Sequence, residues 1–298
     1  MAKFLSLTVV FDGQNLNYGE GVGNIGALKR LSMKGKSFSY ISRQALRYDM
    51  VRIMNEMFNV PFTPIGQDGK VVQFEKDAII KDFPEIDLFG YMKTGKNCGN
   101  GKQSIRKAPS RLSDAISLEP YNNDLEFGNN MGLSHRKKDT DNMLFQFETH
   151  KSLYSYTMTI DLDKIGVDDN DGLNLDAGER AQRVNYLLDA VKILYRDIRG
   201  KRENLSPQFV IGGIYKAGNP FFYNKIEVSY SKDKCLLNTD KINEALEITI
   251  SDKKIEDDTA IGVSTGTFSN TADLKISPVT IENFFSGVKK KVSSHYGS

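Results

Sequence analysis

Residues 39–61, SYISRQALRYDMVRIMNEMFNVP, predict a long amphipathic helix. Apolar side chains recur along it at the spacing of one helical face, at Leu46, Met50, Ile53 and Met57. Ser39 is a suitable N-cap, and Pro61 ends the helix because the residue before a proline is pushed out of helical geometry. We therefore expect the apolar stripe of this helix to be buried against the rest of the protein.

Strands and helices follow one another on both sides of this helix. The run LSLTVVF at 5–11 ends in Asp-Gly and predicts a strand. In LYSYTMTIDL at 153–162, apolar and polar residues alternate as in a half-buried strand. Asp176 and Glu179 form a capping-box-like start for a helix that runs to Gly200. Further strands are expected at 208–215 and 225–230, and further helices at 239–247 and 279–292.

This order of elements predicts an α+β fold, a ferredoxin-like sandwich with long insertions. Between 59 and about 150 the periodicity gives way to short apolar pieces and Gly/Asn-rich loops, which we interpret as an elaboration of a compact core. The alternative is a doubly wound parallel sheet. Two long amphipathic helices are too few to cover both faces of such a sheet, so we favour the sandwich.

Composition limits the class of protein. The 298 residues are 39% hydrophobic and 26% charged, which is typical of a soluble globular protein of one decorated domain or two small ones. The N-terminal run lacks the features of a signal peptide, and no apolar run approaches the roughly 20 residues of a membrane span. Cys98 and Cys235 offer no disulfide framework. We expect a cytoplasmic protein that does not bind a membrane.

Positive charge is local and not global. The chain has 40 Lys and Arg against 38 Asp and Glu, which excludes a uniformly basic nucleic-acid binder. Residues 28–50 nevertheless hold six basic side chains against one acid, and residues 93–111 hold six and none. Further basic segments lie at 134–138 and 289–291. One such run is usually a solvated surface, but several Gly/Ser-rich runs favour contact with a polyanion backbone.

Several motifs that suggest cofactors or metals lack the required context. GVGNIG at 21–26 matches the dinucleotide fingerprint, but nine residues separate it from the preceding strand and no good helix follows. GYMKTGKN at 90–97 resembles a phosphate-binding loop, but Asn97 lacks the hydroxyl that would ligate magnesium. The three histidines and two cysteines are scattered without metal-ligand spacing. We therefore expect no cofactor, no metal and no catalytic residues.

The start of the long helix predicts a phosphate-binding site. Arg43 and Arg47 are four residues apart on one helix face, in the first turns, where free N–H groups and the helix dipole favour an anion. Ser42 and Gln44 add neutral donors, and the preceding loop supplies Lys29 and Arg30. The alternative is that the two helical arginines pair with acids such as Asp49 or lie over the core.

Four segments in this order resemble a known family. They are NIGALKRLS at 24–32, SYISRQALRYDM at 39–50, DLFGYM at 87–92 and RLSDAISLEPYNND at 111–124. The sequence is similar to the backbone subunit of type I CRISPR Cascade complexes, the Cas-seven family, and within it to the DevR-like group of type I-B systems.

The resemblance implies an architecture. A modified RNA-recognition (ferredoxin-like) palm would comprise 1–58 and 153–298, an inserted fingers region 59–118, and a β-hairpin thumb 119–152. Copies of such a subunit stack along a CRISPR RNA, grip its sugar–phosphate backbone regardless of sequence, and present it to target DNA. The strand aromatics Tyr154 and Tyr156 are expected in the core, which favours backbone gripping over base stacking on the sheet.

The resemblance also implies site residues and partners. By position Ser42, Arg43, Gln44 and Arg47, with Lys29 and Arg30, match the gripping helix and its preceding loop. Further expected RNA contacts are Lys102, Arg106 and Lys107 in the fingers, Arg136, Lys137 and Lys138 in the thumb, and Gly212 and Gly213, which allow close backbone approach or mark a strand bulge. Expected partners are CRISPR RNA, target DNA through the guide, copies of itself in a helical filament, Cas-five-like and large subunits, and transiently the helicase-nuclease.

Two other functions remain open from the residues. The first is an RNA endonuclease of related fold, which processes precursor CRISPR RNA or cleaves target RNA with an aspartate such as Asp12 or Asp139. Such enzymes commonly need a placed histidine or a general acid–base pair, which the scattered histidines do not favour. The second is a nucleotide enzyme built on Gly21–Gly26. We favour a non-enzymatic RNA-binding protein.

Overall fold

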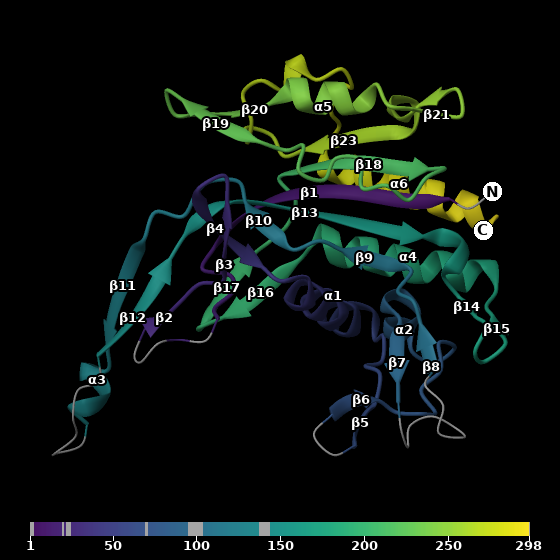
Figure 1. The fold of residues 1–298 in the computed structure, drawn as a ribbon, viewed down its shortest axis with the longest axis horizontal. Helices are drawn as coiled ribbons and strands as arrows, with labels where there is room; N and C mark the ends of the chain where they lie inside the picture. The colour runs from purple at the N-terminus through teal and green to yellow at the C-terminus, as the bar shows by residue number, and fades with distance from the viewer. Residues whose placement is uncertain are drawn as a thin grey trace.

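The computed structural model describes residues 3–19, 21, 25–68, 71–94, 104–136 and 144–297. Its centre is an eight-stranded sheet with the order β23-β18-β1-β13-β10-β4-β3, in which β9 pairs with β13 beside β10 (Figure 1). All pairings in this sheet are antiparallel. Its strands are β1 (Phe4–Gln14), β3 (Arg30–Met33), β4 (Lys36–Ile41), β9 (Ser110–Leu112), β10 (Ala115–Ser117), β13 (Lys151–Asp161), β18 (Phe209–Tyr215) and β23 (Thr259–Val263).

The two central strands form the longest pairing of the molecule. β1 and β13 run antiparallel from Phe4 opposite Asp161 to Gln14 opposite Lys151 without interruption. Both strands are rich in β-branched and aromatic residues, which favour pleated structure, and most of their side chains are buried. Tyr154 and Tyr156 are each 1% exposed, as expected of core residues.

Helices cover one face of the sheet. They are α1 (Arg43–Phe58), α4 (Ala177–Lys192) and α6 (Ile281–Tyr296), and their apolar sides pack on the odd-numbered residues of β1 in one large core. A second, smaller core on the other face lies under α5 (Thr239–Leu246) and the strands β19 (Val228–Ser231), β20 (Lys234–Leu237), β21 (Thr249–Ile250) and β22 (Lys253–Lys254). Short 3-10 helices lie at Leu162–Lys164, Ile255–Asp258 and Thr271–Asp273.

Two extensions project from the helix-covered side at opposite ends of the sheet (Figure 1). The first, here named the arm, consists of β11 (Asp124–Asn129), β12 (Leu144–Thr149), the parallel strand β2 (Ile25–Gly26) and α3 (Met131–Ser134). The second, here named the α2 extension, consists of β5 (Ile65–Asp68), β6 (Val71–Phe74), α2 (Pro84–Phe89), β7 (Tyr91–Lys93) and β8 (Ser104–Arg106). β14 (Val167–Asp168) and β15 (Leu173–Asn174) form a hairpin near it. α1 and the hairpin β16 (Tyr195–Ile198) and β17 (Lys201–Asn204) lie between the two extensions.

The prediction of a mixed α+β fold is confirmed, and the doubly wound parallel sheet is wrong because the central pairings are antiparallel. The long helix begins later than expected. Ser42, with extended backbone, accepts a hydrogen bond from Ala45 N and is the N-cap, whereas Ser39 lies in β4. Met57 is 55% exposed, so the buried stripe ends a turn earlier. Three helices of 16 residues, and not two, cover the sheet.

The second long helix also ends earlier than predicted. Asp176 caps it by accepting from Glu179 N, as expected, but it stops at Lys192. Arg199 and Gly200 have φ of 48° and 76°, which forms the two-residue turn of the β16–β17 hairpin. The apolar spacing through Ile198 therefore belongs to two elements. No helix in the described part of the chain is long and apolar enough to cross a membrane.

Candidate nucleic-acid interface

Helix α1 lies between the two extensions, and its N-terminus directly follows β4 (Figure 1). The Ser42 hydroxyl accepts hydrogen bonds from Ala45 N at 3.4 Å and from Asn17 Nδ2 at 3.3 Å, so it both caps the helix and fixes the segment after β1. Arg43 N donates to Asp114 Oδ1 at 2.7 Å. One of the free N–H groups that were predicted to bind an external anion therefore already donates to a carboxylate of the protein.

The side chains of Arg43 and Gln44 are exposed on the first turn of α1. Neither makes a hydrogen bond or ion pair with any other described residue. Tyr48, one turn further along, is 64% exposed. A cation, an amide and an aromatic ring on one accessible helix surface can bind a phosphate and contact a sugar or base without competing with an internal partner.

Two other predicted phosphate ligands are engaged with acids. Arg47 Nη2 lies 3.0 Å from Glu85 Oε1, and its guanidinium centre lies 5.1 Å from the Phe89 ring. Arg30 Nη2 lies 3.2 Å from Glu148 Oε1, with its guanidinium over Tyr121. Arg47 therefore ties α1 to the α2 extension, and the alternative of pairing with an acid holds for it, although the acid is Glu85 and not Asp49. Arg30 belongs to the base of the arm.

Asp49 is paired with one arginine from β16 and with one from its own helix. Its carboxylate lies 2.6 Å from Arg196 Nη1 and 3.6 Å from Arg52 Nη2. Lys29 is partly buried; its backbone N donates to Asn17 O at 2.8 Å, and its ammonium contacts no acid within the described ranges. Of the six residues predicted around this helix, Arg43, Gln44 and Lys29 keep side chains that an external ligand can engage.

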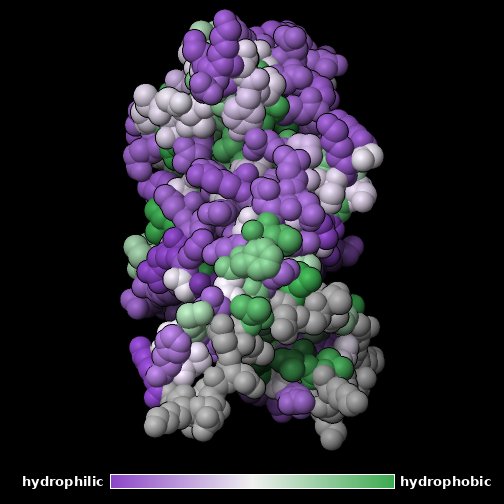
Figure 2. All heavy atoms as spheres, turned by 90° about the vertical axis from the view of Figure 1, so that its left-hand side faces the viewer, coloured by the Kyte–Doolittle hydropathy of each residue, from purple (hydrophilic) through white to green (hydrophobic). Residues whose placement is uncertain are grey.

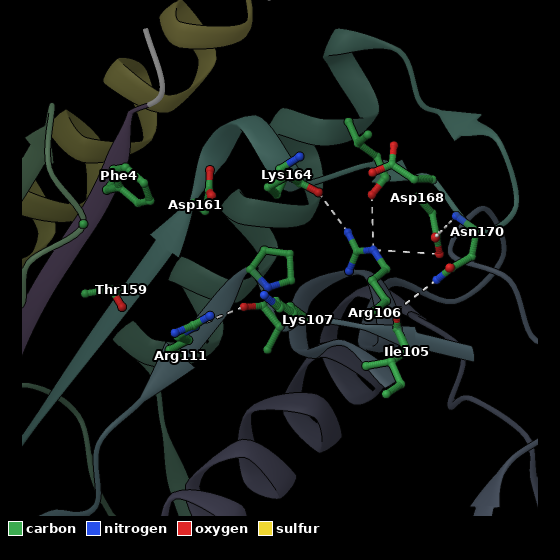
Figure 3. A pocket seen from close by; sticks show the side chains of 15 residues that line it. Phe4, Ile105, Arg106, Lys107, Arg111, Thr159, Asp161, Lys164, Asp168 and Asn170 are labelled. Carbon is green, nitrogen blue, oxygen red and sulfur yellow. Dashed lines mark hydrogen bonds and ion pairs between the residues drawn. The ribbon is translucent and has the colours of Figure 1, made fainter. Parts of the chain in front are cut away.

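Arg106, predicted as an RNA contact, does not lie on the surface. It is 8% exposed, and its guanidinium donates to Asp87 Oδ1 at 2.7 Å. It also donates to the carbonyls of Val167 and Lys164 (Figure 3). It lines a cleft of about 660 Å³ together with Phe4 and Thr159. Lys107 is exposed and lines this cleft too. The cleft opens on the sheet face opposite α1, because Phe4 alternates with the helix-facing Leu5.

Gly212 and Gly213, predicted as RNA contacts, lie inside the sheet. A Cβ on Gly212 would lie 2.0 Å from Ser6 O, and one on Gly213 would lie 2.0 Å from Asp258 O. The pairing of β18 with both neighbours continues through them without a bulge. The close approach that these glycines allow is to the protein's own backbone.

The remaining predicted contacts lie on loops. Arg136 is exposed just after α3, near the end of the arm. Lys102, Lys137 and Lys138 lie outside the described residues. The arm also exposes apolar side chains, and Figure 2 shows hydrophobic atoms gathered toward the arm on this face of the molecule. The exposed apolar side chains of the arm include Leu125, Phe127, Met131 and Leu144, of which Phe127 is 70% exposed.

The β16–β17 hairpin, which was not predicted from the sequence, places further arginines between the two extensions. The Tyr195 ring lies between the guanidinium groups of Arg52 and Arg202, with centroid distances of 4.5 and 4.8 Å. Arg199, at the turn, lies against Tyr18 and Phe147. The signal that could have located them is Arg-Gly-Lys at 199–201, a turn sequence within a segment that apolar spacing alone had made helical.

The arm joins the sheet through a buried polar joint around His150, the residue between β12 and β13. Asn15 N donates to His150 O at 3.2 Å, and His150 N donates to Asn15 Oδ1 at 2.8 Å. The Ser39 hydroxyl lies 2.7 Å from both His150 Nδ1 and Tyr154 OH. This joint satisfies the polar groups of the chain where it leaves the sheet.

Acid is expected to loosen this joint. Burial lowers the pKa of His150 below its ordinary 6.5, although the Glu119 and Asp124 carboxylates oppose the shift. The unfolded chain therefore binds the proton more readily, so the stability that neutral His150 contributes is complete above the unfolded pKa and is lost as pH falls through the folded one. Urea denaturation between about pH 7.5 and pH 5 should show a weaker pH dependence in His150→Gln than in the wild type. His135→Gln, at an exposed site, is the control. If the free energy of unfolding depended on pH equally in the wild type and in His150→Gln, the stabilising role of neutral His150 would be contradicted.

Comparison with known proteins identifies the class of protein. Residues 5–234 match the family model described as "CRISPR-associated negative auto-regulator DevR/Csa2". This chain belongs to that family, which confirms the resemblance to CRISPR backbone proteins. A curated relative, the "CRISPR-associated protein Cas7/Cst2/DevR" of Myxococcus xanthus (strain DK1622), is 27% identical over 161 residues. That match covers 48% of this chain and 52% of the relative, so it spans about half the length of each.

Solved structures share the fold over nearly the whole chain. A chain from a "CRISPR RNA-guided surveillance complex, pre-nicking" has a TM-score of 0.63 and 10% identity, with 97% of this chain and 100% of that chain covered. A chain from another "CRISPR RNA-guided surveillance complex" has a TM-score of 0.59 and 13% identity, with 95% and 99% covered. At these identities the likeness concerns the fold.

Proposed function

We propose that this protein is a CRISPR RNA-binding backbone subunit of a surveillance complex of the type I-B Cascade kind, and that it is not an enzyme. Copies bind side by side along the guide through sequence-independent sugar–phosphate contacts and leave its bases to pair with target DNA. The observation that carries the proposal is the exposed Arg43–Gln44 pair, whose side chains bond to no other described residue, in a member of this family. Contacts to backbone phosphates position a nucleic acid without reading its sequence.

The architecture supports a palm with two extensions. The order β1, α1, β10, β13, α4, β18, with β18-β1-β13-β10 adjacent in the sheet, is the arrangement of a ferredoxin-like unit. We propose that this unit is the RNA-recognition-like palm. Apart from β2, the arm falls within 119–152, proposed as the thumb, and the α2 extension falls within 59–118, proposed as the fingers. The exposed apolar side chains of the arm would then face the guide or the next copy.

The partners follow from this role. Beyond CRISPR RNA and other copies of the chain, we propose contacts with Cas-five-like and large subunits, and a transient contact with the helicase-nuclease. Head-to-tail stacking of identical subunits uses two different surfaces of each copy and produces an open helix when the rotation between copies does not close into a ring. Such an assembly grows with the length of the RNA that it covers.

Native mass spectrometry with single-stranded RNAs of increasing length and unrelated sequence tests the proposal. The number of bound copies should rise stepwise with RNA length and should not depend on sequence. Arg43→Glu should weaken binding by about tenfold or more, because a hydrogen bond to a charged group contributes roughly 1.5–3 kcal/mol and about 1.4 kcal/mol is tenfold in affinity.

The matched control is Lys234→Glu. Lys234 is an exposed cation on β20, over the opposite sheet face, and makes no ion pair with the described residues. The Lys234→Glu variant should bind RNA with the affinity of the wild type. One copy bound at every RNA length, or no binding, would refute the backbone role. Equal losses in both variants would assign the effect to net charge alone.

The non-enzymatic part of the proposal needs a separate experiment. His135 lies near the end of the arm, His150 is buried in the joint, and His295 lies 3.2 Å from Asp163, so the three histidines occupy three separate places. Labelled CRISPR repeat RNA should remain intact when incubated with the protein. Cleavage that persists after repurification and disappears in a histidine or aspartate variant would show that the protein is an endonuclease.

A further inference from the structure

Arg199 is held between two aromatic rings at the base of the arm. Its guanidinium centre lies 3.4 Å from the centroid of Phe147 in β12 and 3.8 Å from that of Tyr18, in the segment after β1. The two rings are themselves in edge contact, with centroids 6.1 Å apart. Three parts of the chain far apart in sequence therefore meet on this one side chain, since it comes from the turn between β16 and β17.

The backbone around Arg199 is shaped to place it there. Arg199 and Gly200 form a two-residue turn with positive φ at both positions, which orients the hairpin tip toward the arm. On the arm, Gly26 leaves the space that the guanidinium fills, because a Cβ at Gly26 would lie 2.4 Å from Arg199 Nη2 and 2.9 Å from Phe147 Cδ1. The last glycine of GVGNIG, which fails as a dinucleotide fingerprint, thus has a structural role.

Arg199 differs from its neighbours in having no acid partner. Arg196 pairs with Asp49 at 2.6 Å, and Arg202 pairs with Asp197 through two nitrogens. Arg199 is exposed and makes no ion pair or hydrogen bond with any described residue. Stacking on ring faces fixes the plane of a guanidinium and leaves its N–H donors for a ligand. An arginine held in this way is preorganised for the two oxygens of a phosphodiester.

The site is continuous with the start of α1. Asn17 Nδ2 donates to Ser42 at the α1 N-cap, and Arg196 Nε donates to Leu16 O. The segment 15–18 therefore connects the α1 N-cap to the Tyr18 ring. Two acids, Glu126 and Glu148, lie near Tyr18. Glu148 is neutralised by Arg30 and accepts from Leu28 N at 2.8 Å, and Glu126 is exposed and makes no ion pair with Arg199.

We propose that Arg199 is a phosphate-binding residue, which takes one phosphodiester of the RNA where the strand passes from the α1 N-terminus to the base of the arm. This assignment rests on the proposed function and extends it to a residue on another element. The aromatic pair holds the guanidinium in place before RNA arrives, so binding does not have to order this side chain.

The salt dependence of RNA affinity tests the assignment. Each phosphate neutralised on a single strand contributes about 0.7 to the slope of log affinity against log salt concentration. Arg199→Gln should lower the slope by about that amount for each bound copy, and Arg199→Lys should retain it. Arg202→Gln is the matched control, because Arg202 lies in the same hairpin, also over a ring, but is paired with Asp197. It should leave the slope unchanged.

The outcomes separate the two proposals. If the wild type binds no RNA, the proposed function fails. If the wild type binds RNA but Arg199→Gln keeps the wild-type slope, Arg199 holds no phosphate and only joins the arm to the sheet. Thermal denaturation of each variant without RNA distinguishes a lost joint from a lost contact, since a structural role alone would lower the melting temperature and leave the salt slope intact.

Discussion

Asp87→Asn is expected to lower the free energy of unfolding by about 3–5 kcal/mol, the cost of breaking a buried ion pair from one side. Asp87 is fully buried. Its two carboxylate oxygens lie 2.7 Å from Arg106 Nη2 and 2.9 Å from Arg183 Nη1, and both accept from Gly166 N. Asparagine keeps the shape but leaves two buried guanidinium groups without their shared counter-charge.

Urea denaturation followed by circular dichroism measures this effect. Asp82→Asn is the control, since Asp82 is exposed and makes no ion pair with the described residues, and its effect should stay within about 0.5 kcal/mol. Replacing all three charged residues by apolar ones of similar volume should restore much of the loss, because the desolvation of the charges is then avoided. A loss below about 1 kcal/mol for Asp87→Asn would mean that the cluster contributes no more than a surface ion pair.

Gly213→Ala is expected to destabilise the sheet by about 3 kcal/mol, at the upper end of the range for overpacked sites. The added Cβ would lie 2.0 Å from Asp258 O and 2.9 Å from Asp258 C. Asp258 directly precedes β23, which pairs with β18, so its backbone atoms cannot move aside as a flexible side chain can. Strand β18 pairs on both edges, with β1 and β23, so a shift that relieves one contact disturbs the other.

Gly287→Ala provides a control of opposite sign. Gly287 lies within α6, and a Cβ there would meet nothing within 4 Å. Alanine should therefore stabilise the protein by about 0.5–1 kcal/mol through helix propensity. The two variants differ from the wild type by the same single methyl group, and denaturant midpoints should move in opposite directions. A stabilised or neutral Gly213→Ala would show that β18 can separate from its neighbour at little cost.

The sequence predicted the parts of the fold that depend on local periodicity. The strands at 5–11 and 153–162 and the helix after Asp176 are present, because alternation and helical spacing report directly which side chains face a core. The start of the helix after residue 39 could not be predicted, because Ser39 and Ser42 are equally good N-caps by residue type. Ser39 is taken up by the hydrogen bonds of β4, so the helix starts at Arg43. The hairpin at 195–204 was missed because its apolar residues continue the helical spacing of α4.

The candidate site was harder to predict, because a basic residue in the sequence does not reveal whether its side chain is exposed or buried in the fold. Arg43, Arg47 and Arg106 look alike in sequence. Arg43 is exposed and its side chain pairs with no described residue, Arg47 pairs with Glu85, and Arg106 lies inside the cluster of Asp87. The acid partners of Arg47 and Arg106 lie 38 and 19 residues away along the chain. Arg199 could not be assigned for the same reason, since Tyr18 and Phe147 reach it only through the tertiary fold.

The way in which the arm joins the sheet has a mechanical consequence. Strand β12 leads directly into β13 through His150, and β13 is paired with β1 along eleven consecutive positions. A pulling force applied to the arm is therefore transmitted along the axis of β13. There it acts in shear on many β1–β13 hydrogen bonds at the same time and does not break them one by one. The arm is thus attached to the longest strand pairing of the molecule. In a subunit under tension along its length, the arm should unfold before the sheet does.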